Sequence, residues 1–534
     1  MDSKYITYIG VDDVEIDLFE SQYVVPEGMC YDSYLVKGDR IAVMDTVDAR
    51  MAGEWMAKLS AALGGRKPDY LVLQHMEPDH SGAVMAFLNE YPDTTIVCSQ
   101  QAANFLLQFN ETLRAEIRPL TAPATGAAKE CCCGNNGIPA EVTAKAHCCG
   151  NNGVPANEAS KEHCCDNNGT HAEVTAKEHC CGNNGVPATG TAKECCCGNN
   201  GIPAEVTAKE HCCGNNGTPA KMAANEHCGN NGTPAEVAAK DHCCGNNGVP
   251  ANEVETLCAE IRTVKEGDCL ELGEGAELQF IAAPMVHWPE VMMTWFAAEK
   301  TLFSADGFGK FGVYDADPDD WACEARRYYF NICGKYGAQV AKVLQKAAGL
   351  DIQRICPLHG PVLTGDRLAE AVRLYTVWSS YKPETPEGIL IAYASIHGNT
   401  AAAARRLANI LEAKGAPKVA VTDLCRDDVA EAVEDAFRMG TMVLACSTYD
   451  GGIFPPMKCF LDKLAMKGFC GRRVALVENG TWAPLAAKLM RASLESMKSI
   501  DILDRTLTIK SSMKESQVPE LEALADLLLT PSSK

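Results

Sequence analysis

Hydrophobic and polar residues alternate with two different periods along this chain, and these periods predict its elements. The stretches KYITYIGVDDVEIDLFE and YDSYLVKGDRIAVMDTV alternate at every second residue, which predicts strands joined by hairpin turns. MAGEWMAKLSAAL and AVMAFLNEY place apolar residues at helical spacing. Apart from one repetitive tract, residues 1–380 are therefore expected to alternate strands with helices, as in an α/β fold.

Several apolar strands in this part end abruptly in polar side chains. YLVLQHMEPDHSG, TLFSADGFG and RICPLHGPV each pass from a predicted buried strand into histidine or carboxylate residues, and MVHWPE adds a further histidine. Strand ends bring side chains together at one rim of a sheet, where a rigid scaffold can hold them around a metal ion. The candidate ligands from this pattern are His75, His80, His287, Asp306 and His359.

The use of histidine supports this interpretation. The chain has 12 histidines, and only those at positions 75, 80, 287, 359 and 397 lie outside the repetitive tract. Imidazole is the commonest neutral metal ligand, and carboxylates suit hard cations. A single H-x-E-x-D-H stretch could be a solvated turn, and His287 beside Trp288 could be ordinary core packing. Four motifs that contain such residues in one chain favour a metal centre instead.

The second half begins after a segment at 381–387 that has the proline and charge content of a linker. ILIAYASIHGNTAAAARRLANILEAKG then reads as a strand, a polar loop and a helix. Backbone amides and the side chains of Ser395, Asn399 and Thr400 would face the helix N-terminus, where the helix dipole favours an anion. The loop lacks the motifs of triphosphate and dinucleotide sites. A monophosphate such as that of FMN fits it better.

Two later strands end in similar polar loops. In a doubly wound sheet, such loops converge at the carboxyl ends of the strands, where ligands bind. Tyr449 and Trp482 are candidates to stack on a flavin ring if the segment resembles a flavodoxin, although taken singly each is more often a half-buried aromatic residue. His397 is interpreted as a solvated loop residue. The candidate cofactor-binding residues are Ser395, Ile396, His397, Gly398, Asn399, Thr400, Ser447, Thr448, Tyr449, Asp450, Gly451, Gly452, Glu478, Asn479, Gly480, Thr481 and Trp482.

A cysteine-rich repeat interrupts the first half between about residues 131 and 250. Its unit, CCGNNGVPAEVTAKEH, recurs every 16 residues, as from Gly134 to Gly150. On its flanks, ETLRAEIR at 111–118 returns as ETLCAEIR at 255–262, an offset of 144 residues (from 111 to 255). We interpret residues 119–262 as a tandem expansion inside one surface loop, since loops tolerate insertions.

Each repeat unit has too little apolar surface to offset the chain entropy of folding, so the insert is expected to be disordered. The alternative is soft-metal or redox buffering, because clusters of histidine and cysteine can hold Zn²⁺ or Cu⁺. Adjacent cysteines chelate a single tetrahedral ion poorly. The inert interpretation is therefore favoured.

Composition narrows the class of protein. A formal net charge of −22 argues against a nucleic acid or an anionic membrane as partner. No run of 18 apolar residues and no signal peptide is visible, so no membrane attachment is expected. Of 28 cysteines, 17 fall in the repeat, which in a chain this long favours a reducing, cytoplasmic location with free or metal-bound thiols.

The motifs HMEPDH, HWPE, SADGFG and CPLHG, in this order, resemble the metallo-β-lactamase-like domain of the flavodiiron proteins, or A-type flavoproteins. The C-terminal part is similar to a flavodoxin. The resemblance implies a metallo-β-lactamase-like αββα sandwich from residues 1–118 and 263–380, followed at 388–534 by a flavodoxin-like doubly wound parallel sheet.

By that resemblance, His75, Glu77 and His287 would hold one iron, and Asp79, His80 and His359 the other, with Asp306 as the bridge. Hydrolytic relatives usually carry H-x-H-x-D-H and bind zinc. Here Glu77 occupies the second position, and its harder oxygen suits iron better. Some family members lose the ligand role at the position of His80. A role for Cys356 close to His359 is an alternative to ordinary core packing.

The resemblance implies an oxidoreductase in which FMN passes electrons to a two-iron site that reduces O₂ to water, NO to N₂O, or both. No rubredoxin module follows the flavodoxin part, so a separate rubredoxin or similar donor is expected, and the protomers are expected to pair head-to-tail in a homodimer or tetramer. Two alternatives are a zinc-dependent hydrolase with an accessory flavodoxin domain and a non-enzymatic FMN electron carrier. Iron content tests the first, and gas turnover tests the second.

Overall fold

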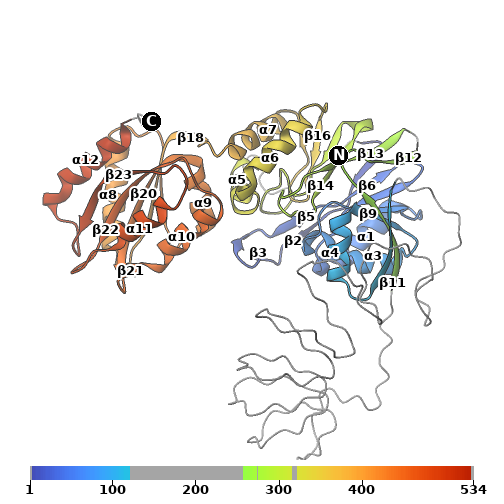
Figure 1. The fold of residues 1–534 in the computed structure, drawn as a ribbon, viewed down its shortest axis with the longest axis horizontal. Helices are drawn as coiled ribbons and strands as arrows, with labels where there is room; N and C mark the ends of the chain where they lie inside the picture. The colour runs from blue at the N-terminus through green and yellow to red at the C-terminus, as the bar shows by residue number, and fades with distance from the viewer. Residues whose placement is uncertain (1–2, 121–256, 274, 315–320, 531–534) are drawn as a thin grey trace, which may run out of the picture. The chain divides into compact units, whose positions relative to one another are not determined.

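The computed structural model describes residues 3–120, 257–273, 275–314 and 321–530. Its first part contains two large sheets (Figure 1). The seven-stranded sheet has the order β1 (Ile6–Tyr8), β6 (Tyr34–Lys37), β7 (Ile41–Met44), β8 (Tyr70–Leu73), β9 (Thr95–Ser99), β11 (Leu257–Val264) and β10 (Leu113–Pro119). The six-stranded sheet has the order β12 (Cys269–Gly273), β13 (Ala276–Ala282), β14 (Met292–Phe296), β15 (Thr301–Phe303), β16 (Arg354–Cys356) and β17 (Leu363–Thr364).

The two sheets pack face to face, and helices cover their outer faces. Val72 of the larger sheet and Phe280 of the smaller one belong to the same buried cluster between them. Trp55 and Phe87 of the outer helices pack together beneath the larger sheet. The helices on that side are α1 (Ala52–Leu63), α3 (Val84–Glu90) and α4 (Gln100–Phe109), and those of the smaller sheet are α5 (Trp321–Ile332), α6 (Gly337–Ala347) and α7 (Gly365–Ser379). The predicted αββα sandwich is confirmed.

Two small two-stranded antiparallel sheets are formed by N-terminal residues of this part. They pair β2 (Val11–Asp13) with β5 (Met29–Tyr31) and β3 (Leu18–Phe19) with β4 (Tyr23–Val24). The backbone of the residues around Cys30 bonds to the loop that follows β16, because Asp32 N donates to Leu358 O over 2.8 Å. The N-terminal hairpins therefore support a loop that carries a candidate ligand.

The duplicated segment forms two neighbouring strands. Its first copy is β10 and its second copy is β11, and they pair in parallel from Leu113 opposite Leu257 onward. The second copy therefore lies within the sheet and continues toward β12, although the sequence analysis placed residues 257–262 inside the insert. The repeat itself lies outside the described residues.

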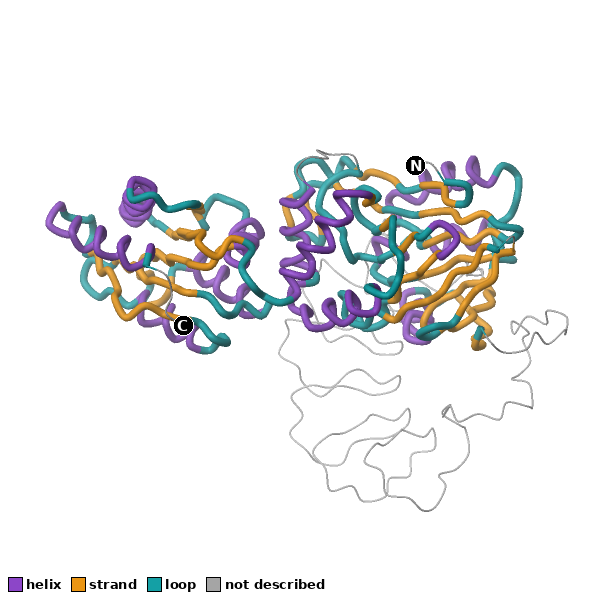
Figure 2. The backbone as a smooth tube through the Cα atoms, turned by 90° about the horizontal axis from the view of Figure 1, so that it is seen from above, coloured by secondary structure: helices purple, strands orange, loops and turns teal. Residues whose placement is uncertain are grey.

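The second part is a five-stranded parallel sheet in the order β19 (Val419–Asp423), β18 (Thr385–Ala394), β20 (Met439–Tyr449), β22 (Arg473–Asn479) and β23 (Asp501–Ile509), with β21 (Gly452–Ile453) paired to β20. Ile391 packs on one face with α8 (Asn399–Ala413) and α12 (Val518–Leu529). Leu390 packs on the other, with α9 (Val429–Arg438), α10 (Pro455–Met466) and α11 (Ala486–Glu495). Figure 2 shows these strands between helices. This is the predicted doubly wound sheet.

The strand order creates a switch point between β18 and β20. The chain leaves β18 toward β19 on one side and later enters β20 on the other, so the loops at their carboxyl ends diverge, and ligands of doubly wound sheets bind at such a point. The predicted linker at 381–387 makes backbone and side-chain contacts with the elements around it. Thr385 already pairs with Met439 of β20, and the Tyr381 hydroxyl donates to Lys335 O over 3.0 Å.

None of the helices in the described ranges is long and apolar enough to cross a membrane.

Candidate metal centre and phosphate-binding loops

The seven candidate ligands come from loops and one short helix that follow the strands of the sandwich. His75 and Glu77 follow β8, and Asp79 and His80 lie in α2 (Pro78–Ser81). The other three are His287, between β13 and β14, Asp306, after β15, and His359, after β16. Their ligand atoms gather in two groups, which are His75, Glu77, His287 and Asp306, and Asp79, His80 and His359. The structure thus brings all seven predicted residues together.

The first group is built around two histidines and two carboxylates. Oε2 of Glu77 lies 3.2 Å from Nε2 of His75 and 2.9 Å from Nε2 of His287. Oδ2 of Asp306 lies 3.2 Å from the same nitrogen of His75 and 3.1 Å from that of His287. Four ligand atoms therefore face one point.

The second group repeats this arrangement. Oδ2 of Asp79 lies 3.3 Å from Nε2 of His80 and 3.3 Å from Nε2 of His359. Those two nitrogens lie 3.1 Å apart. Oδ1 of Asp306 lies 3.2 Å from Nε2 of His80 and 3.9 Å from that of His359. Asp306 thus turns one oxygen toward each group, which is the arrangement of a bridging carboxylate.

Several of these polar atoms have no hydrogen-bond partner although they are buried. They include both carboxylate oxygens of Asp79 and of Asp306. Buried polar groups without a partner are costly, so such a cluster needs cations to balance it. Each site is faced by two imidazoles and two carboxylates, with Asp306 shared between the sites, and this matches the donor set of a two-metal centre. The residues therefore fit a pair of metal ions.

The close approach of carboxylates and imidazoles shifts the pKa values of the candidate ligands. Burial alone would lower the pKa of His287, but the carboxylates of Asp306 and Glu77 raise it to about 9. Burial would likewise lower the pKa of His359, and Asp79 and Asp306 raise it to about 9. Burial would raise the pKa of Glu77, but His287 and His75 lower it to about 2. The Glu77 carboxylate is therefore anionic and can hold a cation.

Two supporting groups escaped the sequence analysis. Oε1 of Glu290 lies 2.9 Å from Nδ1 of His75 and accepts the amide of Met76 over 3.0 Å. Nδ1 of His359 lies 2.7 Å from the backbone oxygen of Cys30. Hydrogen bonds of this kind fix the ring orientation and leave Nε2 for the metal. The HWPE motif contained Glu290, whereas no sequence signal marks a backbone oxygen 329 residues away.

Cys356 occupies a strand position away from the ligands. It lies in β16 opposite Phe303 and is buried among apolar residues between the two sheets. The cysteine that touches the ligand loop is Cys30, whose Sγ accepts the amide of Gly360 over 2.8 Å. Ordinary core packing therefore describes Cys356, and Cys30 is the thiol that supports the loop of His359.

The phosphate-type loop lies between β18 and α8. Ser395 Oγ accepts the amide of Gly398 over 3.1 Å, and Gly398 has a φ of +85°. No side chain caps α8, and a Cβ at Gly398 would meet no atom within 4 Å. Open space in front of uncapped helix amides is suited to a phosphate. This loop therefore fits the phosphate of FMN.

The three loops interlock at their bases. The hydroxyl oxygens of Thr400 and Ser447 lie 2.9 Å apart, and Nδ2 of Asn479 donates to Thr400 Oγ1 over 3.3 Å. Glu478 instead accepts the amide of Ala487 over 3.0 Å, so its carboxylate holds the start of α11. The loops thus meet at one end of the sheet, as predicted. Some of the predicted cofactor-binding side chains shape the loops through bonds to their neighbours.

The aromatic candidates differ in exposure. Trp482 is 91% exposed, and Tyr449 is 44% exposed and lies 5.4 Å from the ring of Phe454. Asp450 and Gly451, with φ values of +48° and +71°, form the turn after Tyr449. His397 is exposed in the first loop. Tyr449 and Trp482 therefore remain able to pack against a flavin ring or another surface.

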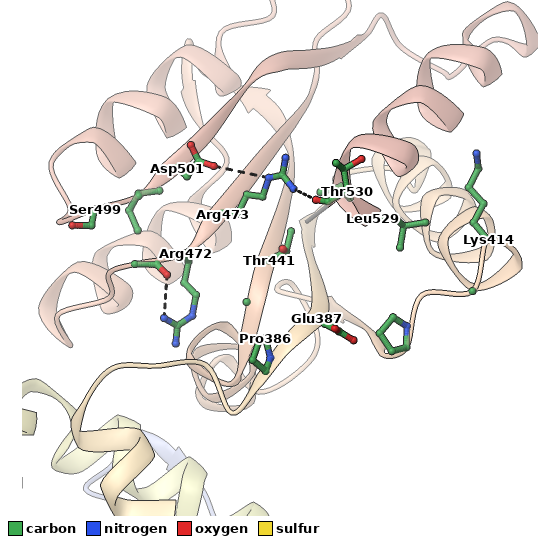
Figure 3. Close-up of a pocket in the computed structure, with 16 residues that line it drawn as sticks. Pro386, Glu387, Lys414, Thr441, Arg472, Arg473, Ser499, Asp501, Leu529 and Thr530 are labelled. Atoms are coloured by element: carbon green, nitrogen blue, oxygen red, sulfur yellow. Dashed lines mark hydrogen bonds and ion pairs between the residues drawn. The ribbon is translucent and has the colours of Figure 1, made fainter. Parts of the chain in front are cut away.

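A groove of about 870 Å³ lies at the opposite end of this sheet (Figure 3). Its lining includes the first residues of β18, β22 and β23. Arg472 already donates to the backbone oxygens of Met439 and Tyr381, and Arg473 donates to Thr530 O over 2.6 Å. Because these guanidinium groups bind backbone oxygens, the groove is a weaker cofactor site than the loops at the carboxyl ends.

Comparisons with known proteins agree with this geometry. A family described as "ODP family beta lactamase" matches residues 252–360. Among solved structures, the flavodiiron protein from Giardia intestinalis covers 98% of this chain and 94% of its own, with a TM-score of 0.67 at 17% identity. The fold is that of the flavodiiron proteins. The rubredoxin oxygen:oxidoreductase from Desulfovibrio gigas matches 99% of this chain and 96% of its own, with a TM-score of 0.67 at 19% identity.

This flavodiiron-like chain is also similar in sequence to curated proteins that are named as nitric oxide reductases. The anaerobic nitric oxide reductase flavorubredoxin of Salmonella typhi is 26% identical over 272 residues, which is 49% of this chain and 54% of the relative. That of Vibrio vulnificus is 20% identical over 499 residues, or 92% of this chain and 71% of the relative. The chain thus spans about half the length of several curated relatives that it matches. The resemblance inferred from the motifs is confirmed.

Proposed function

We propose that this protein is an oxidoreductase that takes electrons from a rubredoxin-like donor and uses FMN and a two-iron site to reduce O₂ to water, NO to N₂O, or both. The observation that carries the proposal is the position of Asp306, whose two oxygens face two separate histidine pairs. Such a bridge suits two metal ions that act on one small substrate. The names of the relatives, nitric oxide reductase and rubredoxin oxygen:oxidoreductase, support the reaction class.

We assign His75, Glu77 and His287 to one iron, Asp79, His80 and His359 to the other, and Asp306 to both. When bound, two irons supply redox equivalents and open positions for a diatomic gas. The side chains of Glu77 and His287 are 16% and 11% exposed, whereas His75 and His80 are fully buried. The substrate would therefore approach on the side of Glu77 and His287. An oxygen ligand at position 77 favours iron over zinc, which makes the hydrolase alternative weaker.

The flavin would be held by the loops after β18, β20 and β22. Gly398 leaves room for the phosphate, Ser395 fixes the loop, and Thr400, Ser447 and Asn479 hold the loop bases together. Bound FMN exchanges one or two electrons, so it can couple a one-electron donor to the metal pair. An electron carrier without catalysis would not require the seven convergent ligands.

We further propose that two protomers pair head-to-tail, so that the flavin loops of one copy lie near the metal ligands of the other. Trp482, 91% exposed, and Tyr449, 44% exposed, give these loops an apolar surface that a second copy would cover. The free buried thiols of Cys30, Cys98 and Cys446 are compatible with a reducing compartment, and we propose a cytoplasmic location.

The test reduces the purified protein, loaded with iron and FMN, through a rubredoxin under anaerobic conditions, and then follows O₂ or NO with electrodes. The proposal expects one or both gases to be consumed as reduced rubredoxin is oxidised. The variant Asp306→Asn should lose gas consumption while its FMN remains reducible. If wild-type FMN is reduced but neither gas disappears, the reductase is wrong. Zinc retained in preference to iron would then support the hydrolase.

Coexpression of two inactive variants tests the pairing. One variant carries Asp306→Asn, and the other carries Gly398→Val to prevent flavin binding. In a head-to-tail pair, the flavin of the first copy would serve the metal site of the second, so purified mixed dimers should recover activity. Mixed dimers without activity would contradict the pairing and leave the reaction itself standing.

A further inference from the structure

The duplicated segment places two nearly identical strands side by side. Residues 113–119 read LRAEIRP, and residues 257–263 read LCAEIRT. In the parallel ladder, each residue lies opposite its own copy, from Leu113 opposite Leu257 to Pro119 opposite Thr263. The second copy also pairs with β9, where Ile261 lies opposite Ile96. One copy is therefore inner, beside β9, and the other is outer.

The inner copy is the more buried at two of its three apolar positions, whereas at the third, Leu113 of the outer copy is 2% exposed and Leu257 is only partly buried. Ile261 and Ala259 are 0% and 7% exposed, and both belong to the main apolar cluster. Their counterparts in the outer copy, Ile117 and Ala115, are only partly buried at the margin of that cluster. The same side chains could nevertheless fill the inner position, because their type and their alternation are identical.

The outer copy also begins close to the place that the inner strand occupies. Helix α4 ends at Phe109, and the amide of Leu113 bonds to Asn110 O over 3.0 Å. Because α4 itself packs on β9 and β11, the chain that leaves it reaches either position within a few residues. An exchange of the two copies would keep their parallel register. It would also move Val264, which pairs with Ser99 of β9, and the connection from β11 to β12.

One difference between the copies explains the observed choice. Position 263 of the inner copy is threonine, which lies opposite Cys98 of β9 on one side and Pro119 on the other. The outer copy has Pro119 at this position. Proline has no N–H to donate and is tolerated at a sheet edge better than in a central strand. The copy with threonine is therefore favoured beside β9.

The register also places like charges opposite one another, Glu116 beside Glu260 and Arg118 beside Arg262. Like charges at such positions are unfavourable. Here each strand pairs its own charges, since Arg118 bonds to Glu116 and Arg262 lies 2.5 Å from Glu260. The neutralised pairs allow two copies of one strand to lie in register.

We propose that residues 113–119 and 257–263 are alternative occupants of one strand position beside β9, so that the protein carries a spare copy of a core strand. Pro119 biases the choice toward the second copy. The proposal does not depend on the proposed redox function, because it concerns only how the sheet is completed. It predicts that, when a substitution disrupts residues 257–263, residues 113–119 can take their place beside β9.

The experiment uses the full chain and the variant Ile261→Asp, which places a charge at a fully buried position. On its own, this variant should lower the Tm by roughly 10 °C, as buried charges do. Addition of Pro119→Thr should restore most of the lost Tm and of the bound metal, because the outer copy can then take the inner position. Hydrogen exchange should show protection moving from amides 257–263 to amides 113–119.

The matched control places the same kind of defect in a neighbouring strand, as Val97→Asp in β9, where Pro119→Thr should restore nothing. A third variant adds Ile117→Asp to the rescued chain and should abolish the rescue. If Pro119→Thr fails to raise the Tm of Ile261→Asp, or if exchange protection stays at 257–263, the two copies are not interchangeable. Rescue of Val97→Asp would also overturn the proposal, since the effect would then be general stabilisation.

Discussion

The carboxylate of Glu290 holds the imidazole of His75, with Oε1 of the acid 2.9 Å from Nδ1 of the ring and both side chains fully buried. The contact joins residues 215 positions apart in the chain. Because the carboxylate fixes the proton on Nδ1, it leaves Nε2 free to face Glu77 and Asp306. The orientation of the first metal group therefore depends on a residue that is not itself in that group.

Removal of this support should weaken metal binding without abolishing it. We expect Glu290→Ala to lower the affinity for iron by about 10-fold to 100-fold, as loss of such partners does. Glu290→Gln keeps an acceptor oxygen on a side chain of the same shape, so it should lose less affinity for iron. Competition with a chelator measures both affinities. Equal affinity in the wild type and in Glu290→Ala would show that His75 is oriented by other contacts.

The bridge position of Asp306 predicts a different stoichiometry from that of Asp79. Asp306→Asn removes a charge shared by both groups, so both metal ions should be lost or strongly weakened. Asp79→Asn affects only the group of His80 and His359, and about one iron per chain should remain. Metal analysis after gel filtration gives the ratio. The interpretation of a bridge fails if the two variants retain the same amount of iron.

Two glycines at opposite ends of α8 allow a matched test of the phosphate loop. Gly398 and Gly415 both have a φ of +85°, and neither has an atom within 4 Å of where a Cβ would lie. Gly398→Ala and Gly415→Ala should each cost about 1–2 kcal/mol in the free energy of unfolding, because the left-handed region disfavours a side chain. Only Gly398→Ala should also reduce FMN affinity, measured by fluorescence titration. A similar loss of FMN affinity in both variants would mean that backbone strain alone, and not contact with the phosphate, weakens FMN binding.

A buried ion pair predicts how stability depends on pH. Arg326 donates to Glu384 over 2.8 Å and to Glu434 over 2.5 Å. Burial would raise the pKa of Glu384, but Arg326 lowers it below 4.5. A carboxyl group with a lowered pKa in the folded state stabilises the protein above its unfolded pKa. This contribution is lost as the pH falls below about 4.5 toward the folded value.

Arg326→Met should therefore act in two ways. At pH 7, it should lower the free energy of unfolding by about 3–5 kcal/mol, because the Glu384 carboxylate is left without its partner. Burial raises the pKa of Glu434 to about 8, so that group is largely protonated at this pH. Below about pH 4.5, the loss of stability per pH unit should become smaller than in the wild type. Urea unfolding between pH 3 and pH 7 measures both effects. As a control, Lys458→Met removes an exposed ion pair with Asp462. It should change neither the free energy of unfolding at pH 7 nor its dependence on pH by a measurable amount.

The ligand set could be recognised from sequence because each ligand follows a strand whose apolar pattern is visible. His75, Asp306 and His359 follow β8, β15 and β16 as the pattern predicts. The phosphate loop around Gly398 was visible for the same reason, since strand, polar loop and helix follow one another locally. Support through the backbone oxygen of Cys30 was invisible, because every residue has such an oxygen and only the fold decides which of them meets His359.

The sequence alone determined the two-part α/β organisation, the seven candidate ligands, the three candidate flavin loops and the offset of the duplicated segment. These features depend on periodicity and motif order, which are local properties of the chain. Only the tertiary structure decided that Asp306 faces both histidine pairs, that Glu290 orients His75, and that the second copy, rather than the first, lies beside β9. Each of these depends on contacts between distant residues, and their geometry is set by sheet packing that no local pattern encodes.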